Sequence, residues 1–428
     1  MRQISRLYCW ILLIVLSSCS VKKNIQTTTT TDIQTNPYSA NLLINDTALN
    51  TAHIGIGLYD ADNNNYLYQY QSNKYFIPAS NTKIMTCYAV MKYLGDSLEG
   101  LKYDVNSDSS INIQGTGDPT FLHPAFKDRS IYNFLSNQRI INYCENCSTW
   151  QFKPFGKGWT NDDYYENYMN ERSAFPIYGN NRSVYSRLDS TVYYVNQSQT
   201  LKHIYAGSQG LRSTISYNIN DTSSRELPFY LKLIIDTLGK NNFQTIDCSK
   251  SKLSKTIYSY PTDTALSYMM HNSDNFFAEQ LLLMASNKHL GVMNDVKMFD
   301  TLLATDFKDF PQKPKWADAC GLSRYNLFTP EDIVYVLGKV RNEFKQNRIK
   351  VIFPAGNQGT LKGYYTNYSD NIHAKTGSMS GVFCISGYLT TKQNKHITFS
   401  VMVNNHQAKG ESLRRKIEAY LNKVIEEN

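Results

Sequence analysis

Three short motifs with reactive side chains are spread along this chain of 428 residues. They are Ser80-Asn-Thr-Lys83, Ser273-Asp-Asn275 and Lys375-Thr-Gly377. If they form one site, the fold has to bring segments from the beginning and the end of the chain together. Their side chains would supply a nucleophile, a base, a proton relay and a cation for a carboxylate, a set that favours acyl transfer through serine.

The first motif has a local context that suits this chemistry. Residues 54–59 and 66–70 predict two strands joined by a turn-rich connection. Residues 81–94 contain neither Gly nor Pro and are apolar on most faces, which predicts a buried helix with Ser80 at its N-terminus. On a helix, Ser80 and Lys83 lie on one face within hydrogen-bond reach. Lys83 can take the Ser80 proton only if its pKa is lowered, and burial together with the cation of Lys375 would lower it.

The second motif would complete the proton transfer. Ser273 can relay a proton from Lys83 to a leaving amine, and Asn275 can hold the peptide backbone of a substrate through its amide. We count Asp274, which lies between them, with the substrate-binding residues. The same motif also suits an ordinary helix start, because Ser and Asp are favoured N-caps.

The third motif would bind the end of a substrate. Lys375 and Thr376, expected at a strand edge, can bind a carboxylate through charge and hydroxyl, and Gly377 allows close approach of the substrate backbone. The backbone N–H groups of Ser80 and Ser378 are the predicted oxyanion hole.

Each motif is common when taken alone. Ser-x-x-Lys also occurs at residues 20–23 and 249–252, and an N-capping serine with a solvated lysine one turn later is an ordinary feature of helices. A Lys-Thr-Gly triplet can simply be an exposed strand end. The prediction therefore depends on the order of the three motifs and on the structure expected around each.

The N-terminal region has the pattern of an export signal. Residues 1–18 combine Arg2 and Arg6 with an apolar run of about ten residues, too short to span a bilayer, which needs roughly 20. Small residues before Cys19 resemble a lipobox, so we predict a lipoprotein signal peptide and a lipidated Cys19. The alternatives are a plain signal peptide or a core helix with an incidental cysteine. Residues 19–38 are polar and repetitive and predict a flexible tether.

Charge and cysteine usage exclude some functions. The formal charge of +8 falls to +6 without Arg2 and Arg6, and the basic residues are scattered, which argues against nucleic-acid binding. Cys144-x-x-Cys147 is only half of a four-ligand zinc site, and a local disulfide or two free thiols is the favoured interpretation. Cys87 and Cys384 are expected to pack as small hydrophobic residues. We predict no metal and no cofactor.

The chain alternates between two kinds of sequence. Helical patterns begin near residue 261, strands are predicted at 372–378, 381–389 and 396–403, and a last helix at 410–427. The intervening part is rich in Tyr, Asn and Ser and favours short strands. We therefore predict an α+β fold with a discontinuous catalytic domain, residues 39–95 and 262–428, whose antiparallel sheet is flanked by helices, and a mainly β insertion, residues 96–261.

Several further segments point to a known family. They are residues 77–83, 115–120, 158–163, 173–174, 180–181, 273–279, 321–326, 359–361 and 374–381. On these residues the chain resembles the class C penicillin-binding proteins, the D-alanyl-D-alanine carboxypeptidase/endopeptidase group of penicillin-recognising serine enzymes. The resemblance runs from about residue 53 to the last strands. It fails at Asp318-Ala-Cys-Gly321, where the family usually reads Asp-Gly-Ser-Gly.

The resemblance implies a penicillin-binding/β-lactamase-type transpeptidase domain. It also implies that Ser80 is acylated by peptidoglycan stem peptides ending in D-Ala-D-Ala, that D-Ala is released, and that the acyl-enzyme is hydrolysed. Cleavage of crosslinks would use the same residues, and β-lactams would inhibit the enzyme. The expected location is the periplasmic side of a bacterial membrane, with Cys19 anchored in the outer membrane.

Two other functions compete with this interpretation. One is a serine β-lactamase, because Glu166-x-x-x-Asn170 resembles the segment that carries a deacylating Glu in class A enzymes. Here that segment precedes the Ser273 motif instead of following it, so we treat the match as chance. The other is a non-catalytic lipoprotein that binds the cell wall, which would not need Ser80 and Lys83.

Overall fold

The computed structural model describes residues 40–145, 149–164, 166–180, 183–186, 191–196, 199–205, 211–218, 229–239, 242–248 and 253–428. The predicted signal peptide, the tether and the lipidation site Cys19 lie outside these residues, as does Cys147. Within the described part, none of the helices combines the length and the apolar character that a membrane span requires.

An antiparallel sheet of five strands joins the two ends of the sequence. Its order is β12-β13-β14-β1-β2. The strands β1 (His53–Asp60) and β2 (Asn65–Tyr70) come from the beginning of the chain. Near its end are β12 (Ile372–Met379), β13 (Val382–Thr390) and β14 (His396–Asn404). β1 pairs with β14 along the whole length of β1. The strands predicted at both ends of the sequence are thus present.

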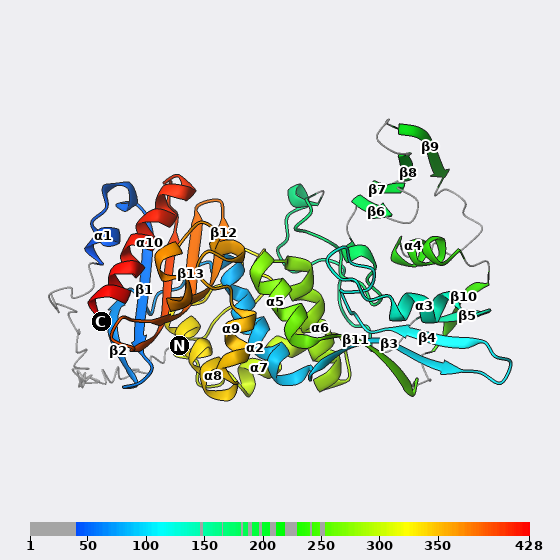
Figure 1. Cartoon of the computed structure of the whole chain (residues 1–428), viewed down its shortest axis with the longest axis horizontal. Coiled ribbons are helices and arrows are strands. Elements are labelled where there is room, and N and C mark those ends of the chain that lie inside the picture. The colour runs from blue at the N-terminus through cyan, green and yellow to red at the C-terminus, as the bar shows by residue number, and fades with distance from the viewer. Residues whose placement is uncertain are drawn as a thin grey trace, which may run out of the picture. The chain divides into compact units, whose positions relative to one another are not determined.

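Helices cover both faces of this sheet (Figure 1). On one face lie α10 (Gly410–Glu427) and the short α1 (Asn41–Ile44). The other face packs against a helical cluster, which is listed here with its bounds: α2 (Lys83–Tyr93), α5 (Thr262–Asn272), α6 (Asn275–Leu290), α7 (Asp295–Ala304), α8 (Pro330–Glu343) and α9 (Gln346–Ile352). Alternate residues of β13 enter the two cores, as a pleated strand requires: Phe383 and Ile385 face α10, and Val382 and Cys384 face the cluster. The predicted α+β class is confirmed.

The chain between these parts is mainly β. A mixed sheet has the order β10-β5-β4-β3-β11, and a separate antiparallel sheet has the order β6-β7-β8-β9. The strands are β3 (Ser97–Val105), β4 (Ile111–Gly115), β5 (Ile141–Glu145), β6 (Ser183–Ser186), β7 (Thr191–Asn196), β8 (Gln199–Tyr205), β9 (Leu211–Asn218), β10 (Phe243–Asp247) and β11 (Lys255–Pro261). Two helices were not anticipated, α3 (Ser130–Ser136) and α4 (Phe229–Leu238). The domain limits 39–95, 96–261 and 262–428 stay predictions.

Short 3₁₀ turns connect several of these elements. Their bounds are η1 (Thr47–Leu49), η2 (Ala79–Thr82), η3 (Asn161–Asp163), η4 (Tyr178–Asn180), η6 (Gly359–Leu361) and η7 (Thr366–Asn371).

A disulfide joins Cys144, in β5, to Cys248, just after β10. These two strands pair in parallel and place Ile246 opposite Cys144. The prediction that Cys144 forms a local bond with Cys147 or stays a thiol is therefore wrong. The true partner is 104 residues away and is brought in by strand pairing, which cysteine spacing does not reveal.

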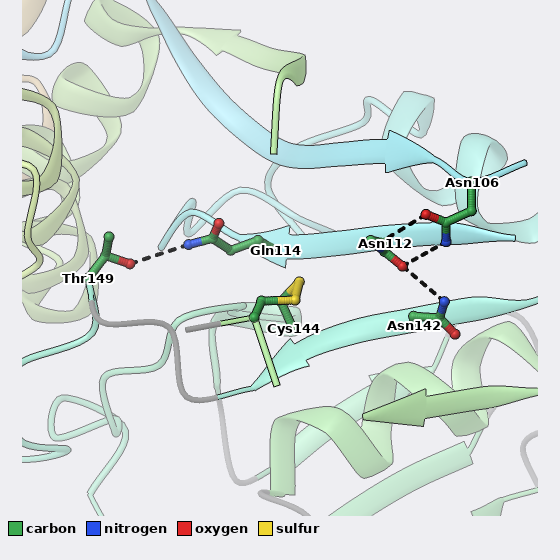
Figure 2. Close-up of a disulfide and its surroundings, with 7 residues drawn as sticks. Asn106, Asn112, Gln114, Asn142, Cys144 and Thr149 are labelled. Carbon is green, nitrogen blue, oxygen red and sulfur yellow. Dashed lines mark hydrogen bonds between the residues drawn. A yellow bond between two sulfur atoms is a disulfide. The ribbon is translucent and has the colours of Figure 1, made fainter. Parts of the chain in front are cut away.

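Amide side chains form a small hydrogen-bond network beside this disulfide (Figure 2). The Asn112 Oδ1 in β4 accepts from Nδ2 of both Asn106 and Asn142, at 2.9 Å each. Cys87 and Cys384 are free and buried, as predicted.

Candidate active site

Ser80 lies in a tight turn at the start of α2. The helix predicted for residues 81–94 begins instead with η2, and regular α-helix starts only at Lys83. In η2 the Asn81 N–H donates to the Pro78 carbonyl at 3.1 Å, the i to i+3 bond of a 3₁₀ turn. Ser80 and Lys83 still lie on one side, with Ser80 Oγ and Lys83 Nζ 3.0 Å apart.

Two glycines let other segments touch this turn. Gly321 has φ +87°, and a Cβ there would lie 1.9 Å from the Ala79 carbonyl oxygen. Gly377 of β12 approaches from the sheet, where a Cβ would lie 2.7 Å from the Pro78 oxygen and 2.9 Å from the Ser80 nitrogen. Because glycine has no Cβ, both segments can pack directly on the backbone around Ser80.

Lys83 is fully buried and has three hydrogen-bond partners. Its Nζ lies 2.6 Å from Asn275 Oδ1, 2.7 Å from the Cys320 carbonyl oxygen and 3.0 Å from Ser80 Oγ. The two carbonyl-type oxygens can only accept hydrogen bonds, so they take two N–H groups of the amine. In the neutral amine, the remaining position is the lone pair, and it faces the Ser80 hydroxyl.

Burial of Lys83 makes this neutral form accessible. Removal from water lowers the pKa of Lys83 below its usual 10.5, although nearby acidic groups, including Asp274, Asp318 and Glu279, act in the opposite direction. Burial, followed by the cations of Lys83 and Arg414, also lowers the pKa of Lys375 well below 10.5.

Ser273 is coupled to the second lysine. It ends α5 in the left-handed region, with φ 55°, a conformation that costs a residue other than glycine about 1–3 kcal/mol and often marks a functional position. Its Oγ accepts from Lys375 Nζ at 2.8 Å, and Lys375 also donates to the Thr376 carbonyl at 2.6 Å. Within the described residues, Lys83 does not bond to Ser273, so the predicted relay is not prearranged as a direct contact.

Asp274 and Asn275, which follow Ser273, both form hydrogen bonds within the protein. Asp274 is the N-cap of α6 and accepts from the Phe277 N–H at 2.9 Å. Burial raises the pKa of Asp274. Asn275 uses one N–H of Nδ2 to donate to the Tyr168 carbonyl at 2.9 Å, while its Oδ1 accepts from Lys83. The amide expected to hold a substrate therefore also ties Lys83 to the segment that contains Tyr168.

The last two predicted binding residues lie on β12. Thr376 is buried, with 5% of its surface exposed, whereas Ser378 is exposed. Gly377, between them, packs on the turn that carries Ser80. The structure thus brings Ser80, the Ser273 motif and the Lys375 motif into one site.

The site also depends on residues that the motifs did not indicate. The backbone segment that carries the Cys320 carbonyl is held by Glu279, whose Oε1 accepts from the Ala319 and Cys320 N–H groups at 2.9 Å each. Glu279 Oε2 lies 2.6 Å from an Arg172 nitrogen, and Arg172 donates to Asp295 at 2.7 Å. Burial raises the pKa of Glu279 to about 7, even though Arg172 lowers it. This cluster fixes an acceptor of Lys83.

One group of potential metal ligands lies in this region of the described structure. Oxygen or sulfur atoms of Glu279, Asp318 and Cys320 lie within 4.8 Å of one another. Asp318 already accepts from the Gly321 and Ser323 N–H groups, at 2.8 and 2.6 Å. Because Glu279 is also paired with the buried cation of Arg172, the chemistry of the cluster does not suit a metal cation.

Comparison with known proteins decides the family. The profile of the D-Ala-D-Ala carboxypeptidase 3 (S13) family matches residues 39–203 and 239–424. The chain belongs to this family. The predicted relationship is confirmed, and the chain is a serine-type D-Ala-D-Ala carboxypeptidase.

Two known proteins are similar to this chain, one over most of its length and one over a smaller part. D-alanyl-D-alanine carboxypeptidase DacB of Haemophilus influenzae is 23% identical over 434 residues, which cover 86% of this chain and 90% of that protein. Penicillin-sensitive carboxypeptidase A of Dictyostelium discoideum is 29% identical over 161 residues, 33% of this chain and 30% of that protein.

Solved structures show the same fold. Penicillin binding protein 4 (dacB) of H. influenzae has a TM-score of 0.67 at 19% identity, covering 90% of this chain and 98% of that chain. The predatory peptidoglycan endopeptidase Bd3459 of Bdellovibrio bacteriovorus has a TM-score of 0.51 at 16% identity, covering 87% of this chain and 92% of that chain.

Proposed function

We propose that the enzyme acts on peptidoglycan stem peptides through an acyl-enzyme on Ser80. The observation that supports this most is the contact between Lys83 and Ser80. The two oxygens of Asn275 and Cys320 occupy two N–H groups of Lys83 and leave the third position to Ser80 Oγ at 3.0 Å. A buried neutral amine in that position is a suitable general base.

The steps of the proposed reaction follow from these contacts. Lys83 takes the proton of Ser80, whose oxygen attacks the carbonyl of the penultimate D-Ala. The N–H groups of Ser80 and Ser378 stabilise the oxyanion. Ser273, held by Lys375, gives its proton to the leaving amine of the terminal D-Ala and receives the one that Lys83 removed. Water then hydrolyses the ester on Ser80.

Substrate binding completes the proposal. The carboxylate of the terminal D-Ala binds beside Thr376, while Gly377, Asp274 and the free N–H of Asn275 line the path of the peptide backbone. Crosslinks between stem peptides present the same D-Ala carbonyl, so the same residues would cleave them. The description of Bd3459 as a peptidoglycan endopeptidase supports this extension.

A mass measurement on the intact protein tests the proposal. Incubation with benzylpenicillin is expected to add one acyl group, on the peptide that contains Ser80, and the adduct is expected to persist for minutes. An N-acylated peptide ending in D-Ala-D-Ala is expected to release D-Ala. Rapid turnover of penicillin without a stable adduct would favour the β-lactamase alternative, and absence of both adduct and D-Ala release would contradict catalysis.

We also propose that the enzyme is exported and held at the periplasmic side of the outer membrane by a lipid on Cys19. The lipobox-like sequence and the polar residues 19–38 support this location. Cys19→Ala is expected to move the protein from the membrane fraction to the soluble fraction, whereas the matched change Cys9→Ala is expected to leave it anchored. Unchanged membrane association of Cys19→Ala would show that another tether is used.

A further inference from the structure

The lysine of the third motif is poorly placed to supply charge to a substrate. Lys375 is fully buried, and its Nζ donates to Ser273 Oγ at 2.8 Å and to the Thr376 carbonyl at 2.6 Å. Burial and the neighbouring cations lower the pKa of Lys375 well below 10.5, which weakens it further as a permanent cation. A carboxylate bound beside Thr376 therefore needs another positive charge.

Arg414 provides a positive charge at this position. It projects from the first turns of α10, and a guanidinium nitrogen donates to Ser378 Oγ at 3.4 Å. The guanidinium also lies 5.2 Å from the ring centre of Phe383 and 5.6 Å from that of Tyr364. These aromatic contacts hold the guanidinium beside the end of β12.

Alternation along β12 places the hydroxyls of Thr376 and Ser378 on the face of the strand that packs against α10. Ile372 and Ala374 of β12 pack in the core shared with α10. Side chains two residues apart lie on one face of a strand, so Thr376 and Ser378 face α10 as well. Arg414 therefore lies on the side of the strand that presents both hydroxyls.

A small cavity lies between these groups. Its volume is about 10 Å³, enough for one water-sized oxygen atom, and it is lined by Thr360, Thr376 and Arg414 together with two tyrosines and three apolar residues. Thr360 Oγ1 is buried there and has no hydrogen-bond partner among the described residues. Two hydroxyls and a guanidinium around such a space suit an oxygen atom that carries negative charge.

Arg414 has no carboxylate partner within the described part of the chain. The next residue, Arg415, pairs with Glu418 at 2.8 Å, but Arg414 forms no ion pair with any described carboxylate. We infer that Arg414 is the residue that binds the terminal carboxylate of the substrate through charge, together with the hydroxyls of Thr376 and Ser378. The inference rests on the proposed function, because it assumes a peptide substrate that ends in D-Ala.

A matched pair of substrates tests this role. One is an N-acylated peptide ending in D-Ala-D-Ala with a free carboxylate, and the other is the same peptide with a terminal carboxamide. In the native enzyme, kcat/KM is expected to favour the carboxylate. Arg414→Met is expected to lower kcat/KM for the carboxylate by roughly 10- to 100-fold, the range for loss of a charge-assisted hydrogen bond, mainly through KM. The carboxamide is expected to change little.

Two further variants separate charge recognition from packing. Arg414→Lys keeps a point charge and is expected to restore part of the preference. Arg415→Met removes the neighbouring arginine of the same helix and is expected to leave the carboxylate-to-carboxamide ratio unchanged. The ratio is independent of the fraction of folded enzyme.

The possible negative results distinguish the role of Arg414 from the proposed function. Equal loss on both substrates in Arg414→Met, or no preference for the carboxylate in the native enzyme, would overturn the role of Arg414 while leaving acylation of Ser80 intact. A native enzyme that releases no D-Ala and forms no penicillin adduct would overturn the proposed function, and with it this inference.

Discussion

Removing Ser80 Oγ is expected to abolish acylation, and removing the Lys83 amine is expected to lower it by about a million-fold, as is found when the base of a serine hydrolase is deleted. In Ser80→Ala there is no oxygen to acylate. In Lys83→Ala the oxygen remains but loses the amine that lies 3.0 Å from it. The measurement is the rate of adduct formation with a fluorescent penicillin, followed by gel and by mass.

Lys92→Ala is the matched control for the lysine change. Lys92 lies on the same helix, α2, but its side chain is 33% exposed and pairs with Asp306 and, at 3.2 Å, with Glu343 instead of contacting Ser80. The folded fraction of Lys92→Ala is expected to label at the native rate, because these ion pairs supply no group to the acylation step. Absence of Ser80-dependent labelling would favour the non-catalytic wall-binding alternative.

The pH profile checks the state of Lys83 separately. Because burial lowers the pKa of Lys83, the neutral fraction rises with pH and passes its midpoint below pH 10.5. Acylation is therefore expected to increase with pH, with a midpoint below that value. A rate that falls with rising pH would show that protonated Lys83 is the active form.

The sequence was sufficient for the parts of the structure that depend on local pattern. Alternation predicted β1 and β2 and the three last strands, and the run without Gly or Pro predicted the helix after Ser80. The order of the motifs was enough to predict one site. Each of these features depends on the types of side chain at a fixed spacing, which can be read from a single chain.

Contacts that backbone groups make could not be predicted from the pattern of side chains. The Cys320 carbonyl contacts Lys83 because Gly321 packs against Ala79, and any residue at position 320 would offer the same oxygen. The 3₁₀ turn at Ser80 and the hydrogen bond from Asn275 to the Tyr168 carbonyl also depend on backbone groups, so the pattern of side chains does not predict them.

Long-range partners were equally hidden. Cys144 meets Cys248 through the pairing of two parallel strands, and Arg414 meets Ser378 through the packing of the last helix. Neither spacing nor composition indicates which of several cysteines or arginines takes part. The sequence therefore predicted the reactive groups but not the contacts that set their protonation and charge.

The buried cluster around Arg172 shows why such contacts matter. Arg172 and Glu279 each expose 1% of their side chains, and Asp295 is the second partner of Arg172. Arg172→Met is expected to destabilise the protein by about 3–5 kcal/mol, because it leaves buried carboxylates without their counter-charge. Urea unfolding measures this loss, and the acylation rate of the folded fraction measures the effect on Lys83 through the Cys320 carbonyl.

The pH dependence of the stability lost in Arg172→Met is expected to show that the charge of Glu279 causes the loss. The pKa of Glu279 is about 7 in the presence of Arg172 and is expected to rise when the arginine is removed, whereas in the unfolded chain it stays near 4.5. A carboxyl group with a raised pKa in the folded state costs stability above that pKa and costs nothing below the unfolded value. The destabilisation of Arg172→Met is therefore expected to be larger near about pH 8 than near about pH 5.

A double variant separates the charge from the hydrogen bonds. Glu279→Gln keeps an oxygen that can accept from the Ala319 and Cys320 N–H groups but removes the negative charge. Arg172→Met combined with Glu279→Gln is therefore expected to recover part of the lost stability and to lose most of the pH dependence. If the double variant is as unstable as Arg172→Met at every pH, packing of the arginine, and not its charge, is what holds the Cys320 carbonyl against Lys83.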